Sequence, residues 1–339
     1  MSSRAEGSVA RLVASAIGEE AAARSLSALR IAPALLSENG ARVSRAAFAM
    51  ALNVVLFDDL LDRVPSGAAY VREVAAENGV FFDHGALRTI RFADGPTGAL
   101  PAGETAFKRL LEPIGYSLAG LYPLPKLKMQ GHVYAHADLP AEIPQFFVSE
   151  LYVDQFDGAF EAAAHRVFDS SRDPIDAATV ATLDSFAAEG SVDFTKAAAA
   201  LPVLAGAFGR HHDVPALTDY EVLKAQSAEA AWIATEGNAF NHATDRVQDV
   251  EALAQMLKDQ GRPMKDTVEI SGSGRVKQTA FRADQVEREF RDADGRMVTR
   301  AVPGSFYEFI TRLDDEAGRI DLKFDAGNAT GIFAMTKAG

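Results

Sequence analysis

Two segments of the chain carry a histidine and an arginine at the same spacing. In the first, a short polar residue precedes His84, and Arg88 follows after three intervening residues. In the second, a short polar residue precedes His242, and Arg246 follows at the same distance. Neutral imidazole is the commonest side-chain ligand for transition metals, so two matched histidines indicate a metal site. The repeated spacing also predicts a duplicated module that starts with a histidine-bearing strand.

A glutamate follows each histidine at an equal distance. Glu150 lies 66 residues after His84 (150 − 84), and Glu308 lies 66 residues after His242 (308 − 242). Both glutamates lie in runs of aromatic and β-branched residues, which predict strands. Two imidazoles and one carboxylate on one face of a metal leave its other face open, as in the facial triad of non-haem Fe(II) oxygenases.

Glu150 leaves two interpretations open. Its position in the repeat matches that of Glu308, so a site with four protein ligands is geometrically possible. Such a closed site would suit isomerisation or hydration better than oxygen chemistry, which needs vacant coordination positions. The alternative is that Glu150 is a relic of duplication and faces elsewhere.

Arg88 is a candidate for binding a carboxylate. Residues four apart in a strand share a face at a separation of about 13 Å, so Arg88 lies on the side of His84. Its planar guanidinium matches the two oxygens of a carboxylate, and an extended dicarboxylate could bridge the distance. His132 and His136 are also about 13 Å apart in a predicted strand, too far for one ion. No role is predicted for the three remaining histidines, His165, His211 and His212.

The composition is that of an ordinary soluble globular protein, with 48% hydrophobic and 24% charged residues among 339. The formal net charge of −13 argues against nucleic-acid and anionic-membrane partners, which need a basic face. Because cysteine is absent, nitrogen and oxygen atoms must hold any metal. No secretory signal and no apolar run long enough for a bilayer is visible, so we expect a cytoplasmic protein. The sequence leaves open whether it forms a homo-oligomer.

The hydrophobic period divides the chain into four parts. Alanine-rich and leucine-rich segments predict helices, whereas aromatic and β-branched runs predict strands. A strand at residues 80–92, a helix at residues 103–114 and further strands up to Glu150 give the order β-α-β-β-β, which the end of the chain repeats. The predicted parts are an N-terminal helical region (1–66), a first module (67–156), a helical insertion (157–235) and a second module (236–339).

Local signals mark the elements of the second module. Asp249 is a predicted helix N-cap, and Asp294-Gly295 predicts a hairpin turn. Residues 297–312 are predicted as one strand that carries the second glutamate. Edge strands are predicted at residues 320–324 and 331–335.

The two modules resemble those of the vicinal oxygen chelate superfamily, with ligands on the first and last strands. Three segments are more specifically similar to the 2-oxoadipate dioxygenase/decarboxylase family, also called hydroxyglutarate synthases: residues 82–89, 238–246 and 304–309. The resemblance implies an α+β fold in which two β-α-β-β-β modules form a curved mixed sheet around a metal, with N-terminal helices and a helical insertion between the modules. It also implies specific roles: Fe(II) ligands His84, His242 and Glu308, and a substrate-binding Arg88.

By this resemblance the protein is an enzyme, a non-haem Fe(II) dioxygenase that decarboxylates a 2-oxo dicarboxylic acid. The implied partners are dioxygen and a small 2-oxo acid, with 2-oxoadipate giving 2-hydroxyglutarate and CO2. Another divalent ion such as Zn, Ni or Mn could occupy the same ligands. Two other classes stay open. One is a glyoxalase-type metal-dependent isomerase, lyase or hydrolase that uses Glu150 as a fourth ligand, and the other is a non-catalytic module that encloses a small molecule.

Overall fold

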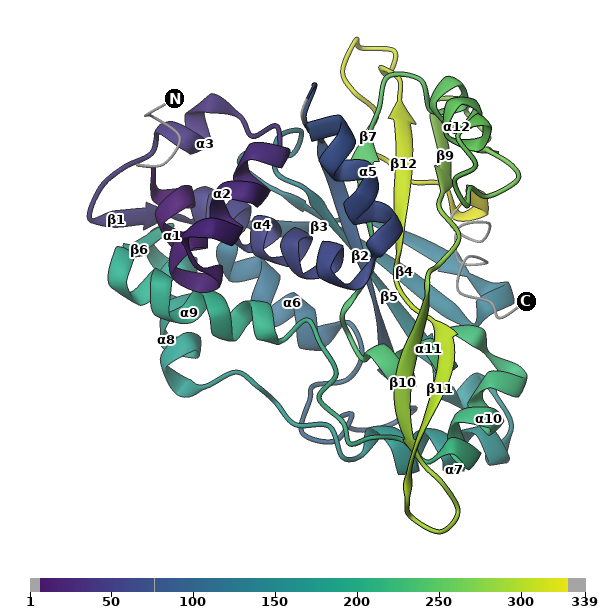
Figure 1. Ribbon diagram of the computed structural model, residues 1–339. Coiled ribbons are helices and arrows are strands. Elements are labelled where there is room, and N and C mark those ends of the chain that lie inside the picture. The colour runs from purple at the N-terminus through teal and green to yellow at the C-terminus, as the bar shows by residue number, and fades with distance from the viewer. Residues whose placement is uncertain (1–6, 76, 329–339) are drawn as a thin grey trace.

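A curled sheet of eight strands forms the centre of the molecule (Figure 1). The computed structural model describes residues 7–75 and 77–328. The order of strands across the sheet is β3-β4-β5-β2-β7-β12-β9-β8. These strands are β2 (Phe82–Arg91), β3 (Tyr116–Leu124), β4 (Met129–His136), β5 (Gln145–Tyr152), β7 (Phe240–Arg246), β8 (Glu269–Ile270), β9 (Val276–Ala280) and β12 (Phe306–Arg312).

Each half of the sheet contains one β-α-β-β-β unit. Outward from the centre, the first half has the order β2, β5, β4, β3, and the second half has the order β7, β12, β9, β8. Helix α6 (Thr105–Leu111) follows β2, and α12 (Val250–Asp259) follows β7. The first and last strands of each unit pair in parallel. The predicted α+β fold with two repeated modules is therefore confirmed, while the residue boundaries of the four predicted parts stay a prediction.

The two halves meet where β2 and β7 pair in antiparallel register. His84 lies opposite Thr244, and Ala86 lies opposite His242. Each histidine is thus opposite the residue two positions beyond the other histidine. Since residues opposite one another, and residues two apart in a strand, share a face, both histidines point to the same face of the sheet.

Helices cover the other face of the sheet. Leu87, Tyr307 and Phe309 of the sheet pack there against apolar side chains of the N-terminal and inserted helices, and together they form the main hydrophobic core. Gly85, between His84 and Ala86, lies under the Phe240 ring, which a Cβ atom at this position would approach to 2.3 Å. The chain therefore needs glycine here for the strand and the helical layer to pack closely.

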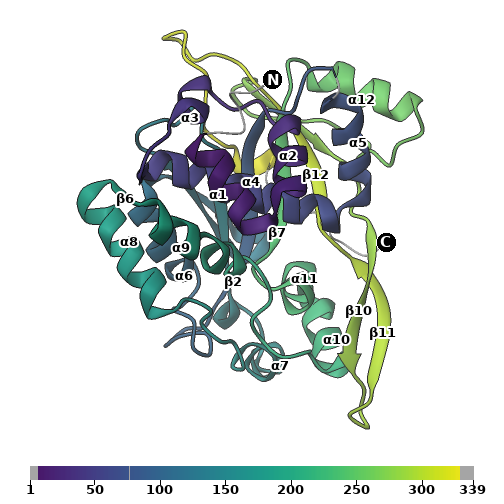
Figure 2. The same ribbon diagram turned by 60° about the vertical axis from the view of Figure 1, so that its left-hand side comes forward.

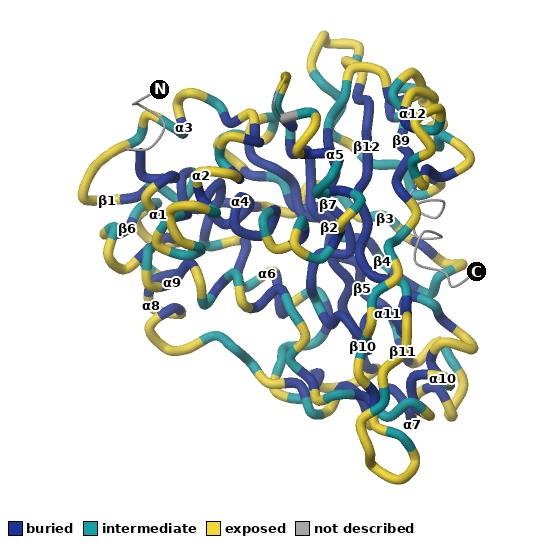
Figure 3. Tube along the Cα trace, in the orientation of Figure 1, coloured by how far each residue is buried: buried dark blue, intermediate teal, exposed yellow. Residues whose placement is uncertain are grey.

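The remaining elements surround this core (Figures 1 and 2). Helix α9 packs against α1 and α4, which joins the inserted helices to the N-terminal ones. Figure 3 shows that buried residues concentrate along the central strands and α4. The helices are α1 (Ser8–Ile17), α2 (Glu19–Ala28), α3 (Pro33–Ser37), α4 (Arg45–Arg63), α5 (Pro65–Ala75), α7 (Gly158–Phe168), α8 (Ala177–Glu189), α9 (Phe194–Gly206), α10 (Leu217–Gln226) and α11 (Ala228–Glu236). The short elements are β1 (Arg42–Ser44), β6 (Ser191–Asp193), η1 (Glu112–Ile114), η2 (Pro125–Leu127) and η3 (Val153–Gln155).

Several predicted elements of the second module are confirmed and others are corrected. Asp249 caps α12 by accepting from two backbone N–H groups, and the predicted Asp294-Gly295 turn joins β10 (Gln285–Arg291) to β11 (Met297–Pro303). The single strand predicted at residues 297–312 is wrong. It divides into β11 and β12, which belong to different sheets, and the β10–β11 hairpin projects from the body (Figure 2).

The edges of the sheet differ from the predictions in part. Strand β3 was not predicted, because its exposed residues follow no clean alternation. Residues 320–324 form no strand, only an isolated bridge between Asp314 and Ile320. The strand predicted at residues 331–335 lies outside the described residues. Among the described residues, no helix combines the length and the apolar character that crossing a bilayer requires.

Candidate metal centre

The central strands bring three candidate ligands together on one face of the sheet. His84 comes from β2, His242 from β7 and Glu308 from β12. Their ligand atoms all lie within 4.8 Å of one another. Glu308 Oε2 lies 2.8 Å from His242 Nε2 and 4.0 Å from His84 Nε2. Within the described part of the chain, this is the single group of three or more such side chains that converges in this way.

The position of Glu308 follows from the register of β12 beside β7. Phe306 lies opposite His242, and Glu308 lies opposite Thr244. Because Thr244 is also opposite His84, the glutamate shares the face of both histidines. All three ligand side chains are buried, with exposed fractions of 2%, 6% and 1% for His84, His242 and Glu308.

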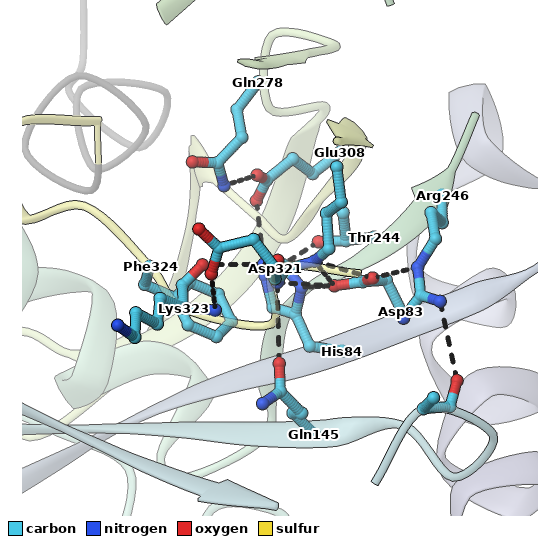
Figure 4. Close-up of polar contacts among 12 residues, drawn as sticks. Asp83, His84, Gln145, Thr244, Arg246, Gln278, Glu308, Asp321, Lys323 and Phe324 are labelled. Carbon is cyan, nitrogen blue, oxygen red and sulfur yellow. Dashed lines mark hydrogen bonds and ion pairs between the residues drawn. The ribbon is translucent and has the colours of Figure 1, made fainter. Parts of the chain in front are cut away.

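Contacts with neighbouring side chains leave one ring nitrogen of His84 directed at this group (Figure 4). His84 Nδ1 lies 2.8 Å from Asp83 Oδ1, and an ionised carboxylate there accepts a hydrogen bond from that nitrogen. The other ring nitrogen, Nε2, then carries the lone pair that faces Glu308, 3.1 Å from Thr244 Oγ1. A carboxylate on the far nitrogen is the usual way in which a protein orients a metal-binding histidine.

Asp83 is kept ionised by two arginines. Arg246 Nε lies 2.6 Å from Asp83 Oδ2, and Arg312 Nη2 lies 2.9 Å from Oδ1. Burial would raise the pKa of Asp83, but the guanidinium groups of Arg312 and Arg246 outweigh burial and hold that pKa well below its ordinary value. Arg246, the arginine of the second histidine–arginine repeat, therefore holds Asp83.

The protonation of the ligands suits a divalent cation. Burial lowers the pKa of His242 despite the nearby Glu308 carboxylate. Burial would raise the pKa of Glu308, but His242, His84 and the Gln278 side chain outweigh burial and lower that pKa. Gln278 Nε2 donates to Glu308 Oε1 at 2.5 Å. This contact holds Oε1 in place, while Oε2 faces the two histidines. Neutral imidazoles and an ionised carboxylate are the forms that bind metal.

The segment after β12 covers the His84 side of the site (Figure 4). The Phe324 ring packs edge-on against the His84 imidazole, with centroids 4.7 Å apart. Arg312 holds this segment by donating to the carbonyl oxygens of Asp321 and Lys323. Tyr122 on β3 accepts a hydrogen bond from the Phe324 backbone N–H at 3.0 Å. No pattern in the sequence singled out Phe324 or Arg312.

Arg88 lies farther along β2 and is fully buried. Its guanidinium carbon lies 5.1 Å from the centre of the Trp232 ring of α11. Burial lowers the pKa of Arg88 to about 10, and the nearby Glu229 carboxylate opposes that shift. The charge of Arg88 also contributes to lowering the pKa of His242. Arg88 therefore lies within electrostatic range of the ligand group, as its strand position predicts.

Glu150 lies on the opposite face of the sheet. Val148, two residues before it on β5, packs in the helix-side core, whereas Phe147 packs on the ligand face against Ala86. The Glu150 carboxylate lies 3.5 Å from His132 Nε2 and accepts from the backbone N–H of Glu104. The interpretation with four metal ligands is therefore wrong, and Glu150 faces elsewhere.

The three residues fit a metal ion. Two nitrogen donors and one oxygen donor converge from one side, as a facial triad requires, and a further contact holds both His84 and Glu308. Burying a charged carboxylate between two neutral histidines costs desolvation free energy, which a bound cation would offset.

The model of the 2-oxoadipate dioxygenase/decarboxylase family matches residues 59–318 of the chain. Two curated relatives are similar to parts of the chain. A chloroplastic 2-oxoadipate dioxygenase/decarboxylase of Arabidopsis thaliana is 27% identical over 216 residues, which are 57% of this chain and 51% of that protein. One from Mycobacterium bovis is 34% identical over 138 residues, 38% of this chain and 33% of that protein. The matches thus span about half of the first relative's length and a third of the second's.

Two solved structures share the fold. A glyoxalase superfamily protein from Ralstonia eutropha JMP134 is 52% identical with a TM-score of 0.90, covering 94% of this chain and 99% of that one. The hydroxyglutarate synthase of Oryza sativa, solved in complex with 2-oxoadipate, is 21% identical with a TM-score of 0.65. The second match covers 86% of this chain and 93% of that one, and it concerns the fold alone.

Proposed function

The chain belongs to the 2-oxoadipate dioxygenase/decarboxylase family, and on that premise we propose that it is an Fe(II)-dependent dioxygenase and decarboxylase of a 2-oxo dicarboxylic acid. The proposed substrate is 2-oxoadipate, which with dioxygen gives 2-hydroxyglutarate and CO2. One oxygen atom would enter the new carboxylate and the other the new hydroxyl group. The atoms of the six-carbon acid and dioxygen are then fully accounted for.

The observation that carries this proposal is the buried convergence of His84, His242 and Glu308 on one face of the sheet. Three ligands on one side leave coordination positions for a chelating 2-oxo acid and for dioxygen. Fe(II), when bound there, would supply the activation of dioxygen, for which no protein side chain suffices. A glyoxalase-type site with Glu150 as a fourth ligand receives no support, because that carboxylate lies on the other face of the sheet.

The other residues of the site would orient the substrate and exclude water. Asp83 holds the His84 ring, and Gln278 holds the Glu308 carboxylate. Phe324 and Phe147, with ring centres 5.2 Å apart, form part of an apolar cluster beside the ligands. In our proposal Arg88, farther along β2, binds the distal carboxylate, so the aliphatic part of the acid would lie over Ala86.

The test is oxygen consumption by protein loaded with Fe(II) under anaerobic conditions and then given 2-oxoadipate and dioxygen. We expect oxygen uptake matched by CO2 release and by formation of 2-hydroxyglutarate. His242→Ala should abolish all three, while Glu150→Gln, altered on the other face of the sheet, should retain them. Uptake by wild type without CO2 release would refute the decarboxylase activity. A protein that holds iron but consumes no oxygen would redirect the search to another 2-oxo acid.

A further inference from the structure

Lys265 lies in the same cross-strand row as Glu308. Glu308 on β12 is opposite Ala280 on β9. The Lys265 backbone N–H donates to the Ala280 carbonyl at 2.9 Å, and the preceding Met264 forms an antiparallel bridge with Phe281. The backbone order across the sheet is therefore Glu308, Ala280, Lys265.

The row faces the metal ligands. Met264 and Phe281 both belong to the helix-side core, so their neighbours Lys265 and Ala280 point to the opposite face, where the Glu308 carboxylate lies. Two strand spacings separate the backbones of Lys265 and Glu308 by about 10 Å. The alanine between them has no side chain beyond Cβ, so the long lysine side chain can extend across it.

Burial and charge place Lys265 in the environment of the site. Its exposed fraction is only 8%, which is unusual for lysine. Burial lowers the pKa of Lys265, and the charge of Glu308 opposes that shift. Its ammonium group is paired with Glu269 of β8, which lies opposite Gln278, the residue that holds Glu308. The partner of the lysine is therefore the cross-strand neighbour of the residue that contacts Glu308.

We propose that Lys265 is a substrate-positioning residue that contacts the metal-chelating carboxylate of the bound 2-oxo acid. This inference rests on the proposed function only in requiring a metal at the triad and an anionic chelator on it. Lys265 would then act at the chelating end of the acid, whereas Arg88 would act at the distal end. Two cations on different sides of the ligand group suit a substrate with two negative charges.

The probe for this role is oxalate, which chelates a metal through two oxygens and has no distal group. Binding is measured by calorimetry without dioxygen, on protein loaded with Mn²⁺, so that no turnover is needed. Lys265→Met should weaken oxalate binding about tenfold, the loss expected when a charge-assisted hydrogen bond is removed. Lys265→Arg should restore most of the affinity, while Arg91→Ala, which removes a cation that contacts Glu150 instead of the site, should leave oxalate binding nearly unchanged.

Metal content and thermal unfolding are measured on every variant, so that a loss of metal or of folding is distinguished from a loss of oxalate binding. Glu269→Gln is a second variant, because it removes the present partner of Lys265 without touching the lysine. It should leave oxalate binding equal to that of wild type or tighter.

Two outcomes would overturn the inference: Lys265→Met that retains its metal and binds oxalate like wild type, or metal-loaded wild type that binds no oxalate. Failure of the proposed function looks different. In that case 2-oxoadipate would not be turned over, yet the difference in oxalate binding between Lys265→Met and Lys265→Arg would persist.

Discussion

Asp83 and Arg312 form an ion pair of 2.9 Å in which neither side chain is exposed, although 229 residues separate them. Asp83 lies next to the proposed ligand His84 on β2, and Arg312 lies four residues after the proposed ligand Glu308 on β12. The pair therefore connects two ligand strands that are not hydrogen-bonded to each other. Removing one member of a buried pair leaves the other charge uncompensated, so such pairs are sensitive to substitution.

Asp83→Asn should weaken metal binding by about 10- to 100-fold, the loss typical when a group that orients a metal-binding histidine is replaced. The asparagine can present its amide nitrogen to His84 and stabilise the wrong tautomer. Competition with a chromophoric chelator measures the affinity. Asp245→Asn is the matched control, since Asp245 is equally buried on β7 but contacts Tyr70 and the Phe81 backbone instead of a ligand. It should lower stability while leaving metal affinity within a few-fold.

Glu308→Gln and Glu150→Gln should separate the two glutamates of the repeat. The first removes a ligand and should lower metal affinity by more than about 100-fold, beyond the loss caused by replacing a group that only orients a ligand. The second alters a carboxylate on the other face, so metal stoichiometry should equal that of wild type. Metal content after dialysis, measured by elemental analysis, checks both. Loss of metal from Glu150→Gln in a folded protein would contradict the assignment of faces.

Arg88→Ala should raise the KM for a dicarboxylic 2-oxo acid about 30-fold or more, because a buried charge-assisted contact with the distal carboxylate is lost. The KM for a monocarboxylic acid of the same length should change by less than about threefold, since that acid has no distal charge to bind. Arg91→Ala is the control on the same strand, because Arg91 contacts Glu150 and not the site. Equal effects of Arg88→Ala on both acids would remove its role in recognising the second carboxylate.

Stability should fall in mild acid because of His212. Burial lowers the pKa of this histidine to about 4, and its Nε2 lies 2.9 Å from the Ala234 carbonyl oxygen. The unfolded chain binds the proton near pH 6.5, so the stabilising contribution is complete above that pH and is lost as pH falls toward the folded-state pKa. At pH 5 the loss is about 2 kcal/mol.

Denaturant unfolding at pH 7 and pH 5 checks this prediction. His212→Gln retains a donor for the Ala234 carbonyl but no longer titrates, so the difference in the free energy of unfolding between the two pH values should shrink. His165→Gln, at an exposed position on α7, serves as the control and should preserve that difference. An unchanged pH dependence in His212→Gln would mean that another group is responsible.

The pairing of His84 with His242 and the architecture of the modules could be predicted from the sequence because they depend on local signals. A strand with a histidine on a fixed face, a capped helix after it and a turn at Asp294-Gly295 each leave a short-range pattern. The two histidines share a face because the two modules pair symmetrically at β2 and β7. The repeated histidine–arginine spacing is the signal in the sequence that indicated such a pairing.

The equal spacing of the glutamates was misleading for a structural reason. Gln145 lies opposite His84 in the first half, as Phe306 lies opposite His242 in the second. Two residues after Gln145 on β5 is Phe147, and two residues after Phe306 on β12 is Glu308. Phe147 and Glu308 therefore occupy equivalent positions in the two halves. The first half therefore has phenylalanine at the ligand position, and Glu150, three residues beyond, falls on the other face. The number of residues between two positions depends on the lengths of the loops between them. It therefore does not determine which face of a strand a residue occupies.

Long-range contacts left no signal in the sequence. Arg312 meets Asp83 only because β12 and β2 flank β7, and Lys265 lies in the row of Glu308 only because Ala280 stands between them. Residues 297–312 illustrate the same limit at the level of sheets. Their strand propensity is continuous, but the break at Gly304 directs the two parts to different partners, which propensity cannot indicate.

The junction of β2 and β7 has a consequence for thermodynamics. One proposed ligand comes from the first half of the sheet and two come from the second, so the proposed site needs both halves. A metal bound there would act as a clamp across the junction, and its binding free energy would add to the free energy of unfolding. Chelation and separation of the halves would then be linked equilibria, and the midpoint of thermal unfolding would depend on free metal concentration even without substrate.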